Sequence, residues 1–272
     1  MPICRTIVVL SCVLSWAGQP LAAQLLEQGL ADGLAVITSR TRGVRIASPD
    51  TAARAPELHA VATLSELELT SGNGDSIFFA LSNGIGLGVA ENSQLRFKHY
   101  QQQPFSAGKE SLDYEPSRSK LELQLLQGSL VFSAPQLSPL SEIVIQLPQG
   151  QVRIQRASGQ VHYDEHGAHI SIVSGIVTYA YPGKAEDAFI HAPNRVHISE
   201  QSALAGRIEA SETITDDDAG RRLRKWVDAA RHASQRVVFR VTGEQPAIPQ
   251  PALVAQPGAW QQPSPRPYRY LD

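Results

Sequence analysis

The residues best suited to chemistry lie together in residues 162–169, which read His-Tyr-Asp-Glu-His-Gly-Ala-His. Alternating stretches on either side of a tight turn at Glu165 and His166 predict a β-hairpin that places His162 directly across from His169. Opposite residues of an antiparallel pair have Cβ atoms about 4.5–5.5 Å apart, and Asp164 follows on the same face. Two imidazoles and a carboxylate are ligands that divalent transition metals accept. We therefore keep His162, Asp164 and His169 as a candidate metal site, although a solvent-facing row of polar side chains is the simpler interpretation and is favoured.

Other acidic residues are weaker candidates. Residues 216–218 are three consecutive aspartates, which lack the alternating spacing of a calcium loop and suit a helix N-terminus better. Glu110, Asp113 and Glu115 would have to converge to form the carboxylate pair of a glycoside hydrolase. No G-x-S-x-G, Walker A or H-E-x-x-H motif occurs in the chain. We accordingly expect no catalytic residues, no cofactor and a protein that is not an enzyme.

Three glycines at positions 84, 86 and 88 alternate strictly. Gly84 follows a turn instead of opening a helix, so the run lacks the structural context of a dinucleotide fingerprint. Glycine inside a strand marks a position that another backbone or layer approaches closely. We expect such a close approach at this strand.

The elements that would position these residues follow a repeated phrase: a polar turn, a glycine, then an alternating apolar strand. Its glycines are at positions 43, 84, 128, 150 and 175, and each is expected to supply a turn with positive φ. Short strands are expected on both sides of these turns, among them 121–126 and 130–133, 152–155 and 160–163, and 169–173 and 177–181. The pattern predicts an all-β fold over residues 24–210, an elongated β-solenoid or sandwich-like array of short strands.

The pattern changes near residue 211. Apolar residues spaced by three and four predict one amphipathic helix over about 217–235, capped by Thr215 or Asp216, with Trp226 packed against the β domain. Residues 237–241 could return as one strand, which completes a segment over 211–242. Residues 243–272 are rich in proline and predict a disordered tail; a partner-binding peptide is the alternative.

The first 23 residues have the features of a signal peptide. Arg5 precedes an apolar stretch of about ten residues, and small residues precede a cleavage site between Ala23 and Gln24. The alternatives are an uncleaved anchor and lipoprotein cleavage before Cys12. We expect a periplasmic or secreted protein of the cell envelope. Both cysteines, Cys4 and Cys12, lie in this leader, so the mature chain would have no disulfide and no thiolate metal site.

Charge and hydropathy limit the partners. The chain has 24 Lys and Arg against 26 Asp and Glu, and no basic stretch suggests that it binds nucleic acid. No segment after the leader approaches 18 consecutive apolar residues, so we expect no transmembrane span in the mature chain.

Several stretches between about residues 60 and 200 resemble the FecR-type domain. Residues 67–72, 76–84 and 90–97 resemble its opening strands. Residues 121–132, 143–150 and 167–177 resemble its later parts. The chain departs from the family at residues 156–161, where Arg-Ala-Ser-Gly-Gln-Val replaces the usual G-T-x-F-x-V. The resemblance implies a β domain used for contacts with proteins or envelope components. Known members include transmembrane regulators that relay an envelope signal to a sigma factor, but this chain shows neither their helical domain nor their membrane span, so we expect no such relay.

These observations together predict a non-enzymatic exported β domain that binds an unidentified envelope protein or polysaccharide. The alternatives are a carbohydrate-active β-helix enzyme, which would need carboxylates along one groove, and a structural surface protein that self-assembles.

Overall fold

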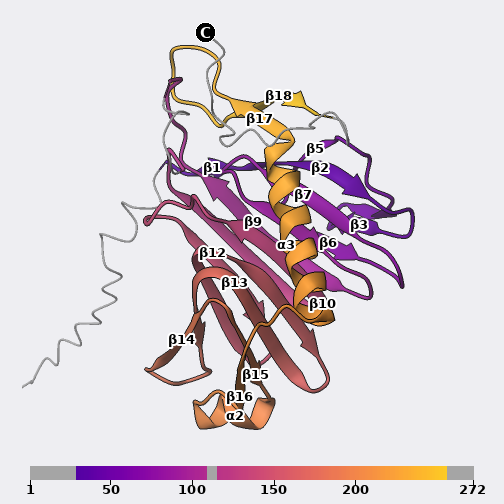
Figure 1. Cartoon of the computed structure of the whole chain (residues 1–272). Coiled ribbons are helices and arrows are strands. Elements are labelled where there is room, and N and C mark those ends of the chain that lie inside the picture. Colours follow the sequence, from indigo (N-terminus) through magenta and orange to yellow (C-terminus); the bar gives the residue numbers. More distant parts are fainter. Residues whose placement is uncertain (1–28, 109–114, 256–272) are drawn as a thin grey trace, which may run out of the picture.

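The computed structural model describes residues 29–108 and 115–255, which form one open sheet of sixteen strands, a two-stranded ribbon and two helices (Figure 1). The leader, Glu110, Asp113 and residues 256–272 lie outside the described residues. In chain order the elements are β1 (Ala31–Asp32), β2 (Leu34–Arg40), β3 (Arg45–Ser48), β4 (Thr51–Arg54), β5 (Val61–Thr63), β6 (Leu67–Thr70), β7 (Ile77–Leu81), β8 (Gly86–Val89), β9 (Gln94–Gln102), β10 (Ser119–Ala134), β11 (Glu142–Leu147), β12 (Gly150–Asp164), β13 (Gly167–Ala180), β14 (Asp187–His191), β15 (Asn194–Ile198), α2 (Glu200–Ala205), β16 (Ala210–Thr213), α3 (Asp218–Gln235), β17 (Val237–Arg240) and β18 (Gln250–Val254).

Three long strands fold this sheet into two layers. The first part of β10 pairs with β9 and β11, whereas its second part pairs with β8 and β12. β12 likewise pairs with β11 through residues 150–154 and with β10 through residues 157–163. β13 follows β12 along its length and pairs with β15 in one part and β14 in the other. The prediction of an all-β, sandwich-like fold is confirmed. Each of β10, β12 and β13, however, is one continuous strand where the sequence predicts two short ones.

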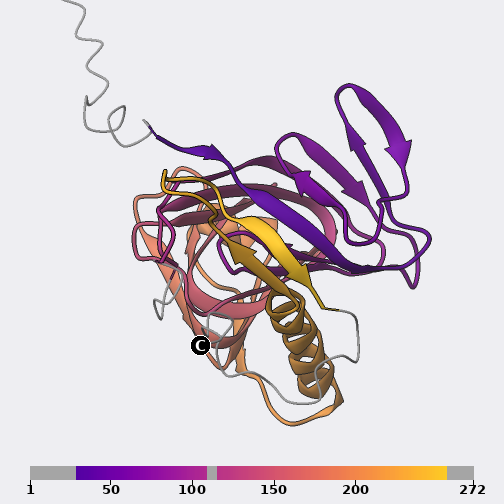
Figure 2. The same cartoon turned by 90° about the horizontal axis from the view of Figure 1, so that it is seen from above.

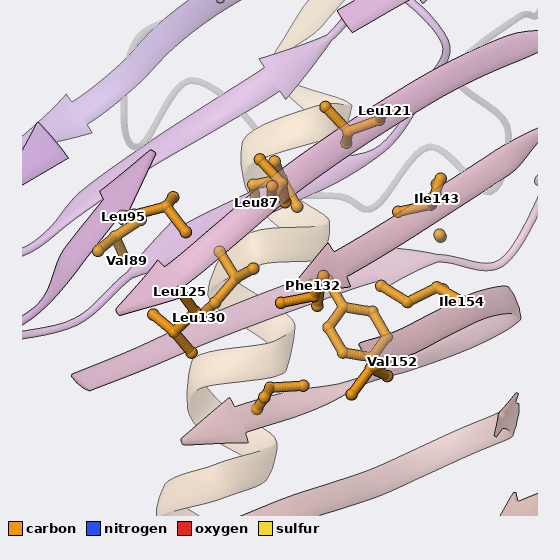
Figure 3. Close-up of a cluster of buried hydrophobic side chains, with 14 of the residues drawn as sticks. Leu87, Val89, Leu95, Leu121, Leu125, Leu130, Phe132, Ile143, Val152 and Ile154 are labelled. Atoms are coloured by element: carbon orange, nitrogen blue, oxygen red, sulfur yellow. The ribbon is translucent and has the colours of Figure 1, made fainter. Parts of the chain in front are cut away.

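The main hydrophobic core lies between the two layers (Figure 3). Phe79 of β7 and Phe97 of β9 meet across it edge to face, with ring centroids 5.7 Å apart. β7 is buried on both faces, while β6 alternates between buried and exposed residues. One layer is therefore covered on its outer side, and the other presents that side to solvent.

Two of the five repeat glycines do not occupy turns, which corrects the sequence prediction. Gly84 and Gly150 lie at tight turns with positive φ, and Gly43 lies in a turn without it. Gly128 and Gly175, in contrast, lie inside β10 and β13 with φ of 88° and 81°. Irregular register lies beside Gly128 in β10 and opposite Gly175 in β12, so these glycines bend long strands from one layer toward the other.

We expect Gly128→Ala to lower the free energy of unfolding by about 2 kcal/mol. An alanine there would have an unfavourable positive φ, and its Cβ would lie 2.5 Å from the Cα of Ser93. Gly183→Ala is the matched control, because Gly183 also has a positive φ but no atom lies within 4 Å of an added Cβ. Urea denaturation gives the free energy of unfolding of both variants. The loss in Gly183→Ala reports the backbone strain alone, and the additional loss in Gly128→Ala reports the close contact. Equal losses in the two variants would contradict a role for close packing at Gly128.

The predicted helix is present as α3 and covers the outer face of β7, β8 and β10 (Figures 1 and 2). Its cap is Asp217, not Thr215 or Asp216, because Asp217 Oδ1 accepts the backbone N–H of Gly220 at 2.7 Å. Trp226 stacks on Phe78 with ring centroids 5.6 Å apart, which confirms its packing against the β domain. An added Cβ on Gly86 would overlap the backbone of Ala230. The predicted close approach at the alternating glycines is thus confirmed, and the approaching layer is α3.

The C-terminal segment is more ordered than the sequence predicted. β17 is the expected return strand, and it pairs with β18, which lies inside the predicted disordered tail. Pro251 is accommodated because β18 is an edge strand, where a missing N–H leaves no buried acceptor unpaired. The ribbon packs on β2 and β7 through Val237 and Phe239, next to Val36 and Ala80.

The short helix α2 was not predicted, because its six residues are too few to show an apolar period. No helix within the described ranges is long and apolar enough to cross a membrane.

Candidate functional site

The predicted hairpin forms, and it extends to a third histidine. β12 and β13 pair His162 with His169, and their ring centroids are 5.9 Å apart. β15 places His197 beside His169, with the two rings stacked at 4.4 Å and 17°. Sequence reasoning missed His197. Its place in an alternating strand shows which face it occupies, but the strand that lies next to it is set by long-range pairing.

His162, His169 and His197 form a row, here called the histidine row, that does not assemble as a metal site. The Nε2–H of His162 donates to Asp164 Oδ2 at 3.2 Å, so Nδ1 accepts from the Ser129 hydroxyl at 2.8 Å. The lone pairs of stacked imidazoles lie in the ring planes and cannot point at one position between the rings. His169 and His197 therefore cannot bind the same metal ion in this arrangement. Within the part of the chain that the structure describes, no group of three or more His, Asp or Glu side chains converges to hold a metal ion.

The environment of the row sets its charges. Burial lowers the pKa of His169, and the neighbouring imidazole of His197 lowers it further. For Asp164, burial raises the pKa, but the hydrogen bonds from the backbone N–H of His166 and from His162 together outweigh it and leave the pKa below its usual value. The central imidazole is therefore neutral near pH 7, while Asp164 is an ionised acceptor.

A cavity of about 370 Å³ adjoins His162 and Asp164. It lies where the loop between β8 and β9, the bend of β10, β12 and the helix α3 meet. Among the residues that line it are Glu91, Asn92, Gln127, Gln160 and Trp226, together with His162 and Asp164. Four segments far apart in the sequence contribute, so no local motif could have revealed this cavity.

Three amides at the cavity have no partner within the described structure. The side chains of Asn92, Gln127 and Gln160 make no hydrogen bond there, so their donors and acceptors are available to a ligand. The carboxylate of Glu91 accepts the backbone N–H of Gly74 at 2.6 Å. Trp226 is half-buried: it stacks on Phe78 and also borders the cavity. The cavity thus combines polar groups that have no internal partner with one indole ring, and both can contact a polar ligand.

The other predicted acidic residues lie elsewhere. Glu115 is buried, and its Oε2 accepts from the Ser141 hydroxyl at 2.5 Å and from the Ser138 backbone N–H at 3.1 Å. It is thus a buried structural carboxyl and not one of a solvent-facing catalytic pair. The aspartates at 216–218 lie at the N-terminus of α3 as predicted, where Asp216 and Asp218 pair with Arg224 and Arg221.

Known solved structures resemble this chain at low identity. No family model matches the chain, and no curated protein matches it. Two crystal structures of a protein described as a "putative anti-sigma factor" from Parabacteroides distasonis are similar, at 15% and 13% identity, each with a TM-score of 0.38. Each match covers 54% of this chain and 59% of that one, so the chain spans less than two thirds of the protein it matches. The likeness is too low to carry an argument about function.

Proposed function

We propose that this protein is a non-enzymatic, FecR-like binding module of the cell envelope, and that the cavity beside His162 is where its ligand binds. The observation that carries this proposal is the set of three unpartnered amides around one cavity, beside a fixed indole ring. Polar groups that fold without partners, and that gather from separate elements, are available for recognition at no cost to internal hydrogen bonds.

Glycoside hydrolysis is the second candidate, because Glu91 and Asp164 border the same cavity. A hydrolase of the usual kind needs one carboxyl that stays protonated and acts as general acid, which requires a raised pKa. The pKa of Asp164 is lowered instead, and both ring nitrogens of His162 are already engaged. These features favour binding over catalysis.

The envelope location in this proposal rests on the leader at residues 1–23 and on the FecR-type resemblance. Cell fractionation of the full chain, with N-terminal sequencing of the product, tests it. A mature N-terminus at Gln24 in the periplasm or medium supports export, whereas an intact leader in the cytoplasm contradicts it.

Affinity capture from envelope extracts tests the binding role. We expect the immobilised wild type to retain an envelope protein or polysaccharide, and Gln127→Ala/Gln160→Ala to retain at least about tenfold less, since two neutral hydrogen bonds are lost. The control is Gln124→Ala/Gln155→Ala, which removes two amides from the same strands, β10 and β12, outside the cavity.

The outcomes of this capture experiment separate the candidates. Equal capture by both double variants would show that the ligand does not bind at the cavity. No capture by the wild type would contradict a binding role. Breakdown of a polysaccharide by the wild type, lost in Glu91→Gln, would establish the hydrolase instead.

A further inference from the structure

We propose that the cavity beside His162 binds one end of a neutral saccharide, with the Trp226 indole against the sugar ring and the three amides on its hydroxyls. This inference rests on the binding role proposed above and names the chemistry of its ligand. It follows from five properties of the cavity: its hydrogen-bonding groups, its aromatic side chain, its charge, its size and the rigidity of its loop.

The hydrogen-bonding groups match hydroxyls. A sugar hydroxyl both donates and accepts, and a carboxamide offers two donors and an acceptor on a planar group. Asn92 comes from the loop between β8 and β9, Gln127 from the bend of β10 and Gln160 from β12, so the amides approach the cavity from three elements. An apolar ligand would leave all three unsatisfied.

The aromatic group supplies the apolar contact that a sugar ring needs. The C–H face of a pyranose is apolar, and an indole gives a large flat contact with few rotatable bonds. Trp226 is the one aromatic side chain of this kind on α3, and its stacking on Phe78 holds it at the edge of the cavity.

Charge excludes acidic ligands. Glu91 and Asp164 border the cavity, and none of the described residues that line it is lysine or arginine. Phosphate or uronate groups would meet two carboxylates with no cation to offset them. The carboxylates already accept hydrogen bonds, Glu91 from Gly74 and Asp164 from His162 and His166, so they do not demand a cationic ligand either.

Size and rigidity complete the argument. At about 370 Å³ the cavity is near the low end of small-molecule sites, which run from about 300 to 1,000 Å³, and it suits a chain end or short saccharide. Asn92 has a left-handed backbone (φ 52°), and its N–H donates to Gly72 at 3.1 Å. The next residue, Ser93, accepts the backbone N–H of Ser129 on its hydroxyl at 2.9 Å, which ties the loop to β10. The backbone of this loop is thus held before a ligand binds, so binding does not have to order it.

Isothermal titration of the full chain with defined sugars tests the proposal. The neutral probes are N-acetylglucosamine, methyl glucoside, methyl galactoside and maltose, and glucuronic acid is the acidic counterpart. We expect at least one neutral probe to bind at millimolar concentration or below, and glucuronic acid to bind at least about tenfold more weakly than its neutral counterpart, methyl glucoside. The fluorescence of Trp226 should change on binding in a Trp16→Phe/Trp260→Phe background, which leaves it as the one tryptophan of the chain.

Variants place the binding in the cavity. Gln127→Ala/Gln160→Ala should weaken binding of the neutral sugar at least about tenfold, and Gln124→Ala/Gln155→Ala should leave it unchanged. Circular dichroism and thermal melting confirm that each variant is folded. Equal weakening by both pairs, stronger binding of glucuronic acid, or no binding of any neutral probe would overturn the saccharide proposal. If sugars fail while envelope capture still depends on Gln127 and Gln160, only the ligand chemistry is wrong; if both fail, the binding role itself is wrong.

Discussion

Gly86→Ala is expected to lower the free energy of unfolding by about 3 kcal/mol, the upper range for overpacking a well-packed interface. The added methyl group would overlap the carbonyl oxygen of Ala230, which belongs to the backbone of α3. A flexible side chain could move aside, but a helix backbone can yield only if the whole helix shifts. Such a shift would separate Trp226 from Phe78 and open the second hydrophobic cluster, which Val131, Leu223 and Val227 help to form.

Chemical denaturation followed by tryptophan fluorescence measures this effect. Gly88→Ala, two residues along the same strand, is the control, because the group that its methyl would meet is the ring of Phe78, which can rotate. We expect a smaller loss of stability for the control. A Gly86→Ala protein as stable as the wild type would show that α3 does not pack on β8 at this distance.

Glu115 is expected to make the protein less stable as the pH rises from about 4.5 to about 7. Burial raises the pKa of Glu115 to about 7, despite hydrogen bonds from Ser141, Ser119 and Ser138 that act in the opposite direction. One of its oxygens, Oε1, is buried without a partner, which disfavours the ionised form. The folded state therefore holds a proton that the unfolded chain releases at the usual pKa, 4.5. Stability is fully present below the unfolded pKa and falls through this window, by on the order of 3 kcal/mol.

Urea denaturation at steps between pH 4.5 and 7.5 tests the effect. Glu115→Gln keeps the shape of the side chain but cannot ionise, so we expect its stability to lose most of the dependence on pH in this range. The exposed Glu142, on β11, supplies the control Glu142→Gln, which should retain the dependence of the wild type. Parallel pH profiles for the wild type and Glu115→Gln would contradict the assignment.

Local patterns predicted the local elements well. The turn at residues 165–166 and the alternation on either side were enough to pair His162 with His169, because a hairpin register follows from its turn. The apolar period of three and four residues likewise predicted α3 to within a residue at its start and at its end. The alternating glycines even indicated a close approach at β8, although not which element approaches.

The same local reasoning failed where distant strands decide the outcome. A glycine with positive φ is compatible with a turn and with a bent strand, so the turns that the sequence predicts at Gly128 and Gly175 are wrong. β10 continues through Gly128 because β9 and β11 pair with one part of it and β8 and β12 with the other. The proline content of residues 243–272 predicts a disordered tail, yet Pro251 lies in the edge strand β18, whose formation depends on pairing with β17.

The amino-acid sequence by itself determined the all-β class, the amphipathic helix and the hairpin with its facing histidines. Each of these depends on periodicity or turn chemistry over fewer than about 20 residues, and side chains express such preferences wherever the segment lies. Only the tertiary structure decided that the long strands join two layers, that His197 extends the histidine row, and that Glu115 is buried. It alone formed the cavity, because Asn92, Gln127, Gln160 and Trp226 come from four segments whose proximity depends on long-range strand pairing and helix packing.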